Sequence, residues 1–447
     1  MVTVITPLPG RPNLLLGAYD LATLGYGAEE FVVSGTARSY ATDDRAEFTT
    51  RIVVCLPTDD AAFNGTVIVE WLNVSGGIDA PAVWLMAHRE IARAGYAYVA
   101  VSAQYVGIEG GDNLVGFDMS LKAQDPTRYS QLVHPGDQYS FDIYSQVGGL
   151  IRDGAVAGLK PESILAVGES QSAMFLTTYV NEVDAIAEVF DGFLVHSRFG
   201  PAAPLTGGSA LDESRPAPFR DALRVPVLSV ITETDLVDGH LLGYHHARRP
   251  DNERLRVWEI PGTAHADNYT IRVGFIDNGS VPLADIVAAY APTNELMGAS
   301  LSYCINFAPQ HHYVLQAAVA SLNRWVRTGE PAPTANPLAL TAGDIPVLVL
   351  DEHELARGGV RTPWVDVPIA RTSGFAPDES PMSFLFGSGE MFDDDVVRRL
   401  YPGGRGDYLE RFTEALDRTI DAGFIVAADR AEILDIAAAS FPDGLER

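Results

Sequence analysis

Cysteine, positive charge and long apolar runs are all scarce in this sequence. Only two of its 447 residues are cysteine, Cys55 and Cys304, and their wide separation predicts reduced structural thiols rather than a disulfide framework. No segment approaches the roughly 18 consecutive apolar residues of a transmembrane helix, and the N-terminal stretch lacks the basic start of a secretory signal. We therefore expect a soluble, cytoplasmic protein without a membrane span.

The charge balance is strongly acidic. The chain carries 31 Lys and Arg against 59 Asp and Glu, which gives a net charge of −28 at pH 7. Such a charge repels phosphate backbones, so we expect no nucleic-acid partner. The apolar share of 47% is typical of a globular chain, and a small molecule is the expected ligand. The composition leaves homo-oligomerisation open.

Strand-like and helix-like segments alternate through most of the chain. The apolar runs are short, rich in Val, Ile and aromatic residues, and bounded by polar or turn residues, which predicts buried strands. The predicted strands span residues 31–40, 48–57, 65–74, 94–104, 162–168, 190–196, 224–232 and 255–262. The predicted helices span 81–95, 139–154, 171–183 and 312–329. This order predicts an α/β fold with a mostly parallel sheet flanked by helices.

The pattern changes beyond the last predicted strand. Residues 266–312 give mixed signals and residues 330–395 are rich in Pro and Gly, whereas residues 406–440 repeat apolar residues at helical spacing. We expect residues 1–330 to form the core, with an N-terminal β extension and the mixed segment as an inserted region. Residues 331–447 are expected to pack on this core as a wrapping extension, with short strands followed by helices.

The sharpest local motif is Gly-Glu-Ser-Gln-Ser at residues 168–172, which a predicted strand enters and a predicted helix leaves. A nucleophile elbow has this context, and it needs small residues two positions before and after its serine, here Gly168 and Ser172. Ser170 is therefore the candidate nucleophile. The alternative is an ordinary serine N-cap, which is common at helix starts.

Two later strand ends carry the partners that a serine nucleophile needs. Thr-Glu-Thr-Asp follows one strand and offers Glu233 and Asp235, and Pro-Gly-Thr-Ala-His follows the next and ends at His265. The order serine, acid, histidine, each beyond the C-terminal end of a strand, predicts a catalytic triad at one edge of the sheet.

At these residues the sequence resembles the α/β-hydrolase superfamily, over about residues 60–330. The resemblance rests on GESQS at the elbow, on VPVLSVITETD before the acid and on EIPGTAH before the histidine. Two further stretches, HPGDQYSFDIYSQ at 134–146 and GGVRTPWVDVPIAR at 358–371, resemble a bacterial group of large α/β-hydrolase-domain proteins. The resemblance thus extends to most of the chain.

The resemblance implies the α/β-hydrolase fold and a Ser-His-Asp triad. In the usual pattern the second acidic position after the strand is the triad acid, which falls on Asp235. Glu233 stays the alternative, because it lies two residues earlier and can face the same side. Ser172 departs from the pattern, since many members have glycine there.

The implied reaction proceeds through an acyl-enzyme. The imidazole of His265 would take the serine proton, and the acid would orient the ring. The developing oxyanion needs backbone donors, and the amide of Gln171, just after the nucleophile, supplies one. We expect the second from Asn73 and Val74, after the third core strand, where a plain Ser-Gly-Gly turn is the alternative interpretation.

Other chemistries are disfavoured. Serine at the elbow argues against haloalkane and epoxide hydrolysis, which use a carboxylate, and favours the hydrolysis of a carboxylic ester, with a thioester, lactone or amide as alternative substrates. An acyltransferase with the same triad and a non-catalytic, ligand-binding relative remain alternatives. No cofactor or catalytic metal is expected. The pairs His245–His246 and His311–His312 lack the HExxH spacing, and adjacent histidines on regular structure point apart.

Overall fold

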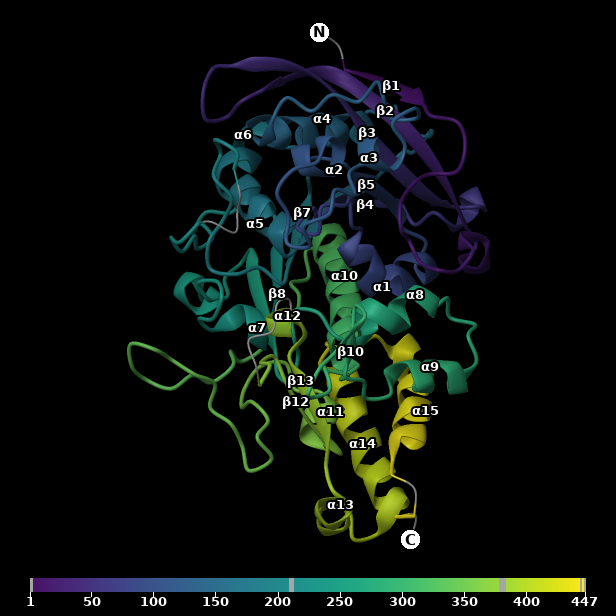
Figure 1. The fold of residues 1–447 in the computed structure, drawn as a ribbon, viewed down its shortest axis with the longest axis vertical. Coiled ribbons are helices and arrows are strands. Elements are labelled where there is room, and N and C mark those ends of the chain that lie inside the picture. The colour runs from purple at the N-terminus through teal and green to yellow at the C-terminus, as the bar shows by residue number, and fades with distance from the viewer. Residues whose placement is uncertain (1–2, 209–212, 378–382, 443, 446–447) are drawn as a thin grey trace.

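The structure is a computed structural model that describes residues 3–208, 213–377, 383–442 and 444–445. One large sheet crosses the molecule, and helices cover both of its faces (Figure 1). The long axis runs from the N-terminal strands to the C-terminal helices. Among the described helices, none combines the length and the apolar composition that a bilayer-spanning segment needs.

Within the described residues, nine strands form the large sheet, in the spatial order β1-β2-β3-β5-β4-β6-β7-β8-β9. The first four in this order pair antiparallel, and from β5 onward the pairs are parallel. The strands are β1 (Val4–Pro7), β2 (Tyr26–Arg38), β3 (Arg45–Pro57), β4 (Thr66–Trp71), β5 (Ala97–Val101), β6 (Ser163–Glu169), β7 (Gly192–His196), β8 (Val227–Thr232) and β9 (Leu255–Ile260). The predicted α/β fold with a mostly parallel sheet is confirmed.

Alternate residues of the central strands face opposite helix layers. In β4, Val67 and Val69 share a buried cluster with Tyr144, whereas Ile68 shares another with Trp84. Because both faces are covered, these strands are apolar at nearly every position. The eight predicted strands correspond to β2 to β9; of the described strands in the large sheet, the short edge strand β1 was not predicted.

Four helices provide most of this cover. Helices α1 (Ala82–Arg93) and α10 (Gln310–Thr328) lie on one face, and α4 (Ser140–Arg152) and α5 (Gln171–Thr178) lie on the other. They correspond to the four predicted helices. Shorter helices of the first 300 residues are α2 (Tyr105–Glu109), α3 (Leu121–Gln124), α6 (Asp184–Ala187), α7 (Glu233–Leu236), α8 (Gly274–Ile276) and α9 (Leu283–Tyr290).

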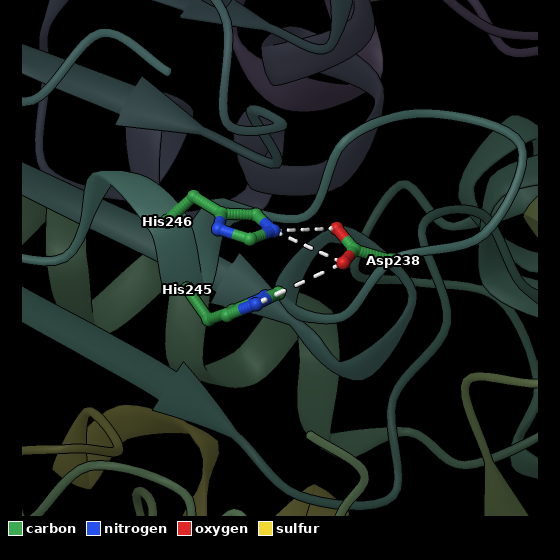
Figure 2. A group of neighbouring side chains, drawn as sticks. All are labelled: Asp238, His245 and His246. Carbon is green, nitrogen blue, oxygen red and sulfur yellow. Dashed lines mark hydrogen bonds and ion pairs between the residues drawn. The ribbon is translucent and has the colours of Figure 1, made fainter. Parts of the chain in front are cut away.

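The turn after α7 brings two adjacent histidines together. A 3-10 helix at Tyr244–Ala247 directs both rings toward Asp238, and the ring centroids of His245 and His246 lie 3.8 Å apart (Figure 2). The expectation that these rings point apart is wrong, because the tight turn does not place successive side chains on opposite sides.

The inserted region and the C-terminal extension contain short elements and two long helices. A small hairpin, β10 (Glu295–Leu296) with β11 (Ala299–Ser300), precedes α10. The extension comprises α11 (Pro363–Asp366), β12 (Ala370–Ser373), α12 (Ser383–Phe386), β13 (Ser388–Met391), α13 (Asp394–Leu400), α14 (Gly404–Asp421) and α15 (Arg430–Ser440). The helical pattern of residues 406–440 is therefore interrupted, and Gly423 in the break has a φ of 82°.

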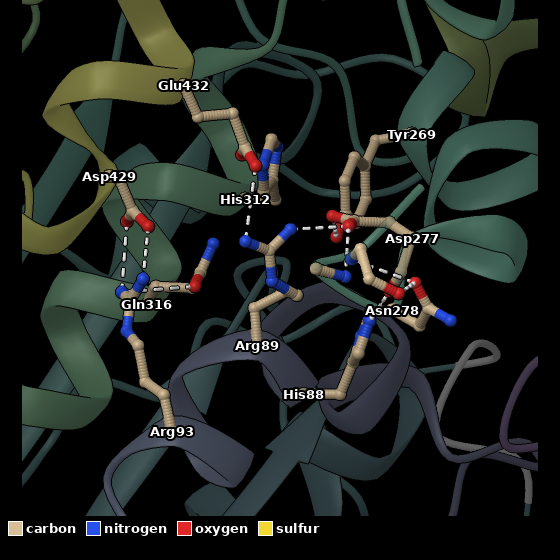
Figure 3. Close-up of polar contacts among 12 residues, drawn as sticks. His88, Arg89, Arg93, Tyr269, Asp277, Asn278, His312, Gln316, Asp429 and Glu432 are labelled. Atoms are coloured by element: carbon tan, nitrogen blue, oxygen red, sulfur yellow. Dashed lines mark hydrogen bonds and ion pairs between the residues drawn. The ribbon is translucent and has the colours of Figure 1, made fainter. Parts of the chain in front are cut away.

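Ion pairs join the extension to the sheet-covering helix α1 (Figure 3). Arg89 Nη2 donates to Glu432 of α15 at 3.1 Å, and Arg93 Nη2 donates to Asp429 at 3.1 Å. The Tyr313 hydroxyl of α10 donates to the same Glu432 at 2.7 Å. Residues more than 300 positions apart in the chain thus meet at one charged interface.

Candidate active site

Ser170 occupies a strained turn between β6 and α5. Its φ of 56° and ψ of −123° lie outside the regions that side chains commonly adopt, as in a nucleophile elbow. A Cβ at Gly168 would lie 3.2 Å from the carbonyl carbon of Ser172, which is tighter than usual, so a glycine fits this turn without any shift of the backbone. The Ser172 hydroxyl accepts from the Glu169 amide at 3.0 Å and donates to the Glu169 carbonyl at 2.8 Å. This pair of bonds explains how serine fits where glycine is more common.

The three residues predicted as a triad meet at the C-terminal edge of the sheet. His265 Nε2 lies 2.8 Å from Ser170 Oγ, and His265 Nδ1 lies 2.6 Å from Asp235 Oδ1. A carboxylate only accepts, so Nδ1 carries the ring proton and Nε2 is free to accept the serine proton. Residues Ser170 and His265 are 8% and 6% exposed. The arrangement is that of a serine nucleophile with its base and orienting acid.

Only one of the two candidate acids reaches the imidazole. The second carboxylate oxygen of Asp235 accepts from the amide and hydroxyl of Thr232 at 2.9 and 2.7 Å, which fixes its orientation. Glu233 instead accepts from the amides of Gly262 and Gly374, at 2.5 and 2.8 Å. Burial raises the pKa of Glu233 to about 7. Glu233 therefore joins the histidine loop and the C-terminal extension to α7.

The surroundings of His265 favour its protonated form. Burial alone would lower its pKa, but the Asp235 carboxylate and then Glu169 outweigh burial, and the pKa is raised above its usual value. The Phe199 ring stacks on the imidazole with centroids 5.3 Å apart. The surroundings therefore stabilise a positive charge on the His265 imidazole.

Glu169 is a site residue that sequence reasoning missed. Its Oε1 lies 3.4 Å from His265 Nε2, and its Oε2 accepts from the Asn73 side-chain amide at 3.1 Å. Burial raises the pKa of Glu169 to about 7, while the nearby His265 opposes that rise. Its position just before the nucleophile was the only signal in the sequence.

The structure corrects one of the three oxyanion-hole expectations. The Asn73 backbone amide donates to the Ala80 carbonyl at 3.0 Å, so it is already engaged. The Val74 amide faces the Gln171 side-chain oxygen at 3.5 Å, a weak contact that a stronger acceptor can replace. The Gln171 amide is at the first position of α5, where a helix offers no internal acceptor. The amides of Val74 and Gln171 therefore remain as the two candidate donors.

The second histidine pair diverges as expected. His311 Nε2 lies 2.8 Å from His196 Nε2, whereas His312 stacks on Tyr269 with ring centroids 3.7 Å apart. The two rings thus serve different buried contacts and offer no shared ligand position.

Comparison with protein families identifies the fold. A family model described as "Alpha/beta hydrolase domain" matches residues 4–435. The chain belongs to the alpha/beta hydrolase domain family. No curated protein matches this hydrolase-domain chain.

Three solved structures illustrate how distant its structural neighbours are. A putative dienelactone hydrolase from Klebsiella pneumoniae is 17% identical, with a TM-score of 0.34, covering 57% of this chain and 98% of that one. The esterase Pf2001 from Pyrococcus furiosus is 12% identical, with a TM-score of 0.30, covering 56% and 86%. XC6422 from Xanthomonas campestris, described as an a/b serine hydrolase without lid, is 16% identical, with a TM-score of 0.30, covering 52% and 85%.

A cavity adjoins the candidate oxyanion donors of this hydrolase-domain chain. It has a volume of about 750 Å³, and its lining includes Val74, Gln171, Tyr105 and Leu114. The volume is in the range of small-molecule sites. A smaller apolar cavity of about 250 Å³ lies among the C-terminal helices. The described residues that line the two cavities include none of the three candidate triad residues, but the larger cavity reaches Gln171, the residue next to Ser170.

Proposed function

We propose that this chain hydrolyses a carboxylic ester by means of Ser170, His265 and Asp235. The observation that carries the proposal is the unbroken hydrogen-bonded chain from the Asp235 carboxylate to the Ser170 hydroxyl, at 2.6 and 2.8 Å. The left-handed turn at Ser170 and membership of the alpha/beta hydrolase domain family support the same reaction.

In the first half-reaction, Ser170 Oγ forms a bond to the acyl carbon of the ester. His265 Nε2 takes the hydroxyl proton, and the electron pair of the carbonyl moves onto its oxygen. The amides of Gln171 and Val74 donate hydrogen bonds to that oxyanion. The carbon–oxygen bond to the alcohol then breaks, and the imidazolium gives its proton to the leaving alkoxide.

In the second half-reaction, water replaces the alcohol. His265 takes a proton from the water as the hydroxide oxygen bonds to the acyl carbon, and the Ser170–acyl bond then breaks. The proton returns to Ser170 Oγ, and a carboxylic acid leaves. Asp235 keeps its charge throughout and holds the imidazole in one orientation.

The cavity beside Val74 and Gln171 is the proposed substrate site. Its rim includes Tyr105 and Leu114, which are 42% and 44% exposed, and apolar groups at a rim favour an uncharged ester over a charged one. The net charge of −28 also disfavours polyanionic substrates.

A panel of p-nitrophenyl esters of increasing acyl length tests the proposal. We expect the wild-type chain to release p-nitrophenol and Ser170→Ala to lose this activity, while Ser130→Ala, at an exposed serine, is the matched control. Equal, background-level rates for wild type and Ser170→Ala across the panel would contradict ester hydrolysis.

Two further measurements test the alternatives of acyl transfer and of ligand binding without catalysis. If an alcohol yields the new ester at the expense of the free acid, the same triad serves acyl transfer. If neither turnover nor acyl-enzyme forms while Ser170→Ala still binds a ligand, the site is a binding site without catalysis.

A further inference from the structure

A second group of histidine and carboxylate side chains lies just beyond the triad acid. His246 Nε2 is 3.0 Å from each carboxylate oxygen of Asp238, and His245 Nε2 is 3.9 Å from Asp238 Oδ2 (Figure 2). One nitrogen or oxygen of each residue lies within 4.8 Å of the others. Three potential ligand atoms therefore converge on one point.

The tautomer of His245 leaves a lone pair facing this point. His245 Nδ1 lies 2.9 Å from the Leu236 carbonyl oxygen, which only accepts, so Nδ1 carries the ring proton in the neutral form. The His245 side chain is 10% exposed, and its buried Nε2 makes no hydrogen bond within the described chain. A metal-binding histidine is held in the same way, with its other nitrogen donating to a carbonyl.

The partner that Nε2 faces is also an acceptor. The 3.9 Å to Asp238 Oδ2 is too long for a hydrogen bond, so protonation of the ring would leave His245 Nε2 without a partner in this arrangement. A cation bound by Nε2, by Asp238 and by His246 would give this buried nitrogen a partner. The Gly243 amide donates to Asp238 Oδ1 at 2.8 Å and so holds the carboxylate in place.

The spacing and the atom types indicate the class of cation. Tetrahedral ligands about 2.1 Å from Zn²⁺ lie ~3.4 Å apart, and the observed nitrogen–oxygen separations of 3.0 and 3.9 Å lie on either side of that value. Two imidazoles and one carboxylate suit Zn²⁺, Co²⁺ or Ni²⁺, whereas Mg²⁺ and Ca²⁺ prefer oxygen ligands.

We propose that Asp238, His245 and His246 bind one divalent transition-metal ion. The ion would link the two ends of the 238–246 loop, which begins next to α7 and its triad acid. Leu242 within the loop accepts from the Gly200 amide at 2.8 Å, next to the Phe199 that stacks on His265. The proposed site is structural, and it does not depend on the proposed ester hydrolysis.

Titration of the tag-free full chain tests this site, after treatment with EDTA and its removal. We expect calorimetry with Zn²⁺ to give one site in the micromolar range or tighter, and Co²⁺ to give a visible absorption band of a nitrogen-containing site. Asp238→Asn and His246→Ala should each weaken binding tenfold or more, because both residues supply ligands. His353→Ala, on a different loop, should bind like wild type.

Thermal unfolding provides a second readout. Excess Zn²⁺ should raise the Tm of the wild type and of His353→Ala, and raise it less in the two ligand variants. These variants change side chains that are 35% exposed, so circular dichroism should show native folding. Failure of the wild type to bind Zn²⁺ or Co²⁺ with one-to-one stoichiometry would overturn the proposal, as would equal affinity in wild type and both ligand variants.

Discussion

Two aspartates three residues apart, Asp235 and Asp238, each pair with a histidine, yet their surroundings differ. Asp235 is fully buried, and the far nitrogen of its histidine meets a serine hydroxyl. Asp238 has a side chain that is 35% exposed, and its two histidines meet no hydroxyl within the described residues. A histidine–carboxylate pair thus acquires its chemistry from its third partner and from its burial.

The largest expected effect is that of Ser170, the third partner of the buried Asp235–His265 pair. Ser170→Ala should lower kcat/KM for the best ester by about 10⁴- to 10⁶-fold, because the nucleophile is lost while the fold remains. Steady-state hydrolysis over the ester panel measures this. A residual rate above a hundredth of wild type would mean that another group attacks the ester.

The next expected effect separates the two acids of α7. Asp235→Asn should lower kcat by about 10⁴-fold, because the amide can favour the wrong tautomer of His265. Glu233→Gln should lower kcat by less than about tenfold, since Glu233 bonds to the amides of Gly262 and Gly374 and not to the imidazole. If Glu233→Gln proves the more damaging in kinetic assays of folded protein, the assignment of the acid is wrong.

A smaller effect, on the pH dependence of kcat/KM, is expected from Glu169, whose carboxyl group lies beside the imidazole of His265. Glu169→Gln removes a carboxyl group with a pKa of about 7, whose ionised form favours the imidazolium, so the pKa of His265 should fall. Hydrolysis needs the neutral ring, so the acid limb of the kcat/KM profile should move to lower pH, by roughly one unit or less. Glu253→Gln, at an exposed glutamate, is the control, and an acid limb that stays in place would contradict this role.

The smallest expected effect is on the free energy of unfolding, through the Asp238–His246 pair in the absence of metal. The Gly243 amide and His246 lower the pKa of Asp238 despite the opposing effect of partial burial. A carboxyl group whose pKa is lowered by folding stabilises the folded state at pH values above its unfolded pKa. This stabilisation is lost as the pH falls through the folded-state pKa. In EDTA, Asp238→Asn should therefore cost less than about 1 kcal/mol of unfolding free energy at pH 6, and the difference should shrink in acid. Urea unfolding at both pH values measures it; a larger cost at low pH would contradict the ion pair.

Much of the fold and the meeting of the three candidate triad residues could be predicted, because they depend on strand ends. In a parallel sheet, the C-terminal ends of neighbouring strands lie at one edge, so Ser170, Asp235 and His265 had to come close once their strands were located. The edge strand β1 escaped prediction because its four residues include a terminal proline and expose most of their surface.

Contacts that depend on the local path of the backbone could not be predicted. The Asn73 amide is engaged because the chain returns to pair it with Ala80, which local pattern does not reveal. Glu169 reaches His265 only because of how the elbow turns, and His245 and His246 converge only because a 3-10 helix replaces regular structure. Each of these depends on a few backbone angles rather than on periodicity.

Covalent trapping of the nucleophile tests the central claim most directly. A fluorophosphonate mixed with the wild-type chain should add one phosphonyl group per molecule, and peptide mass spectrometry should locate it on Ser170. Labelling should be absent in Ser170→Ala and much slower in Asp235→Asn, and the Ser130→Ala control should react as wild type does. A chain that hydrolyses esters but carries its adduct elsewhere, or none, would contradict the account.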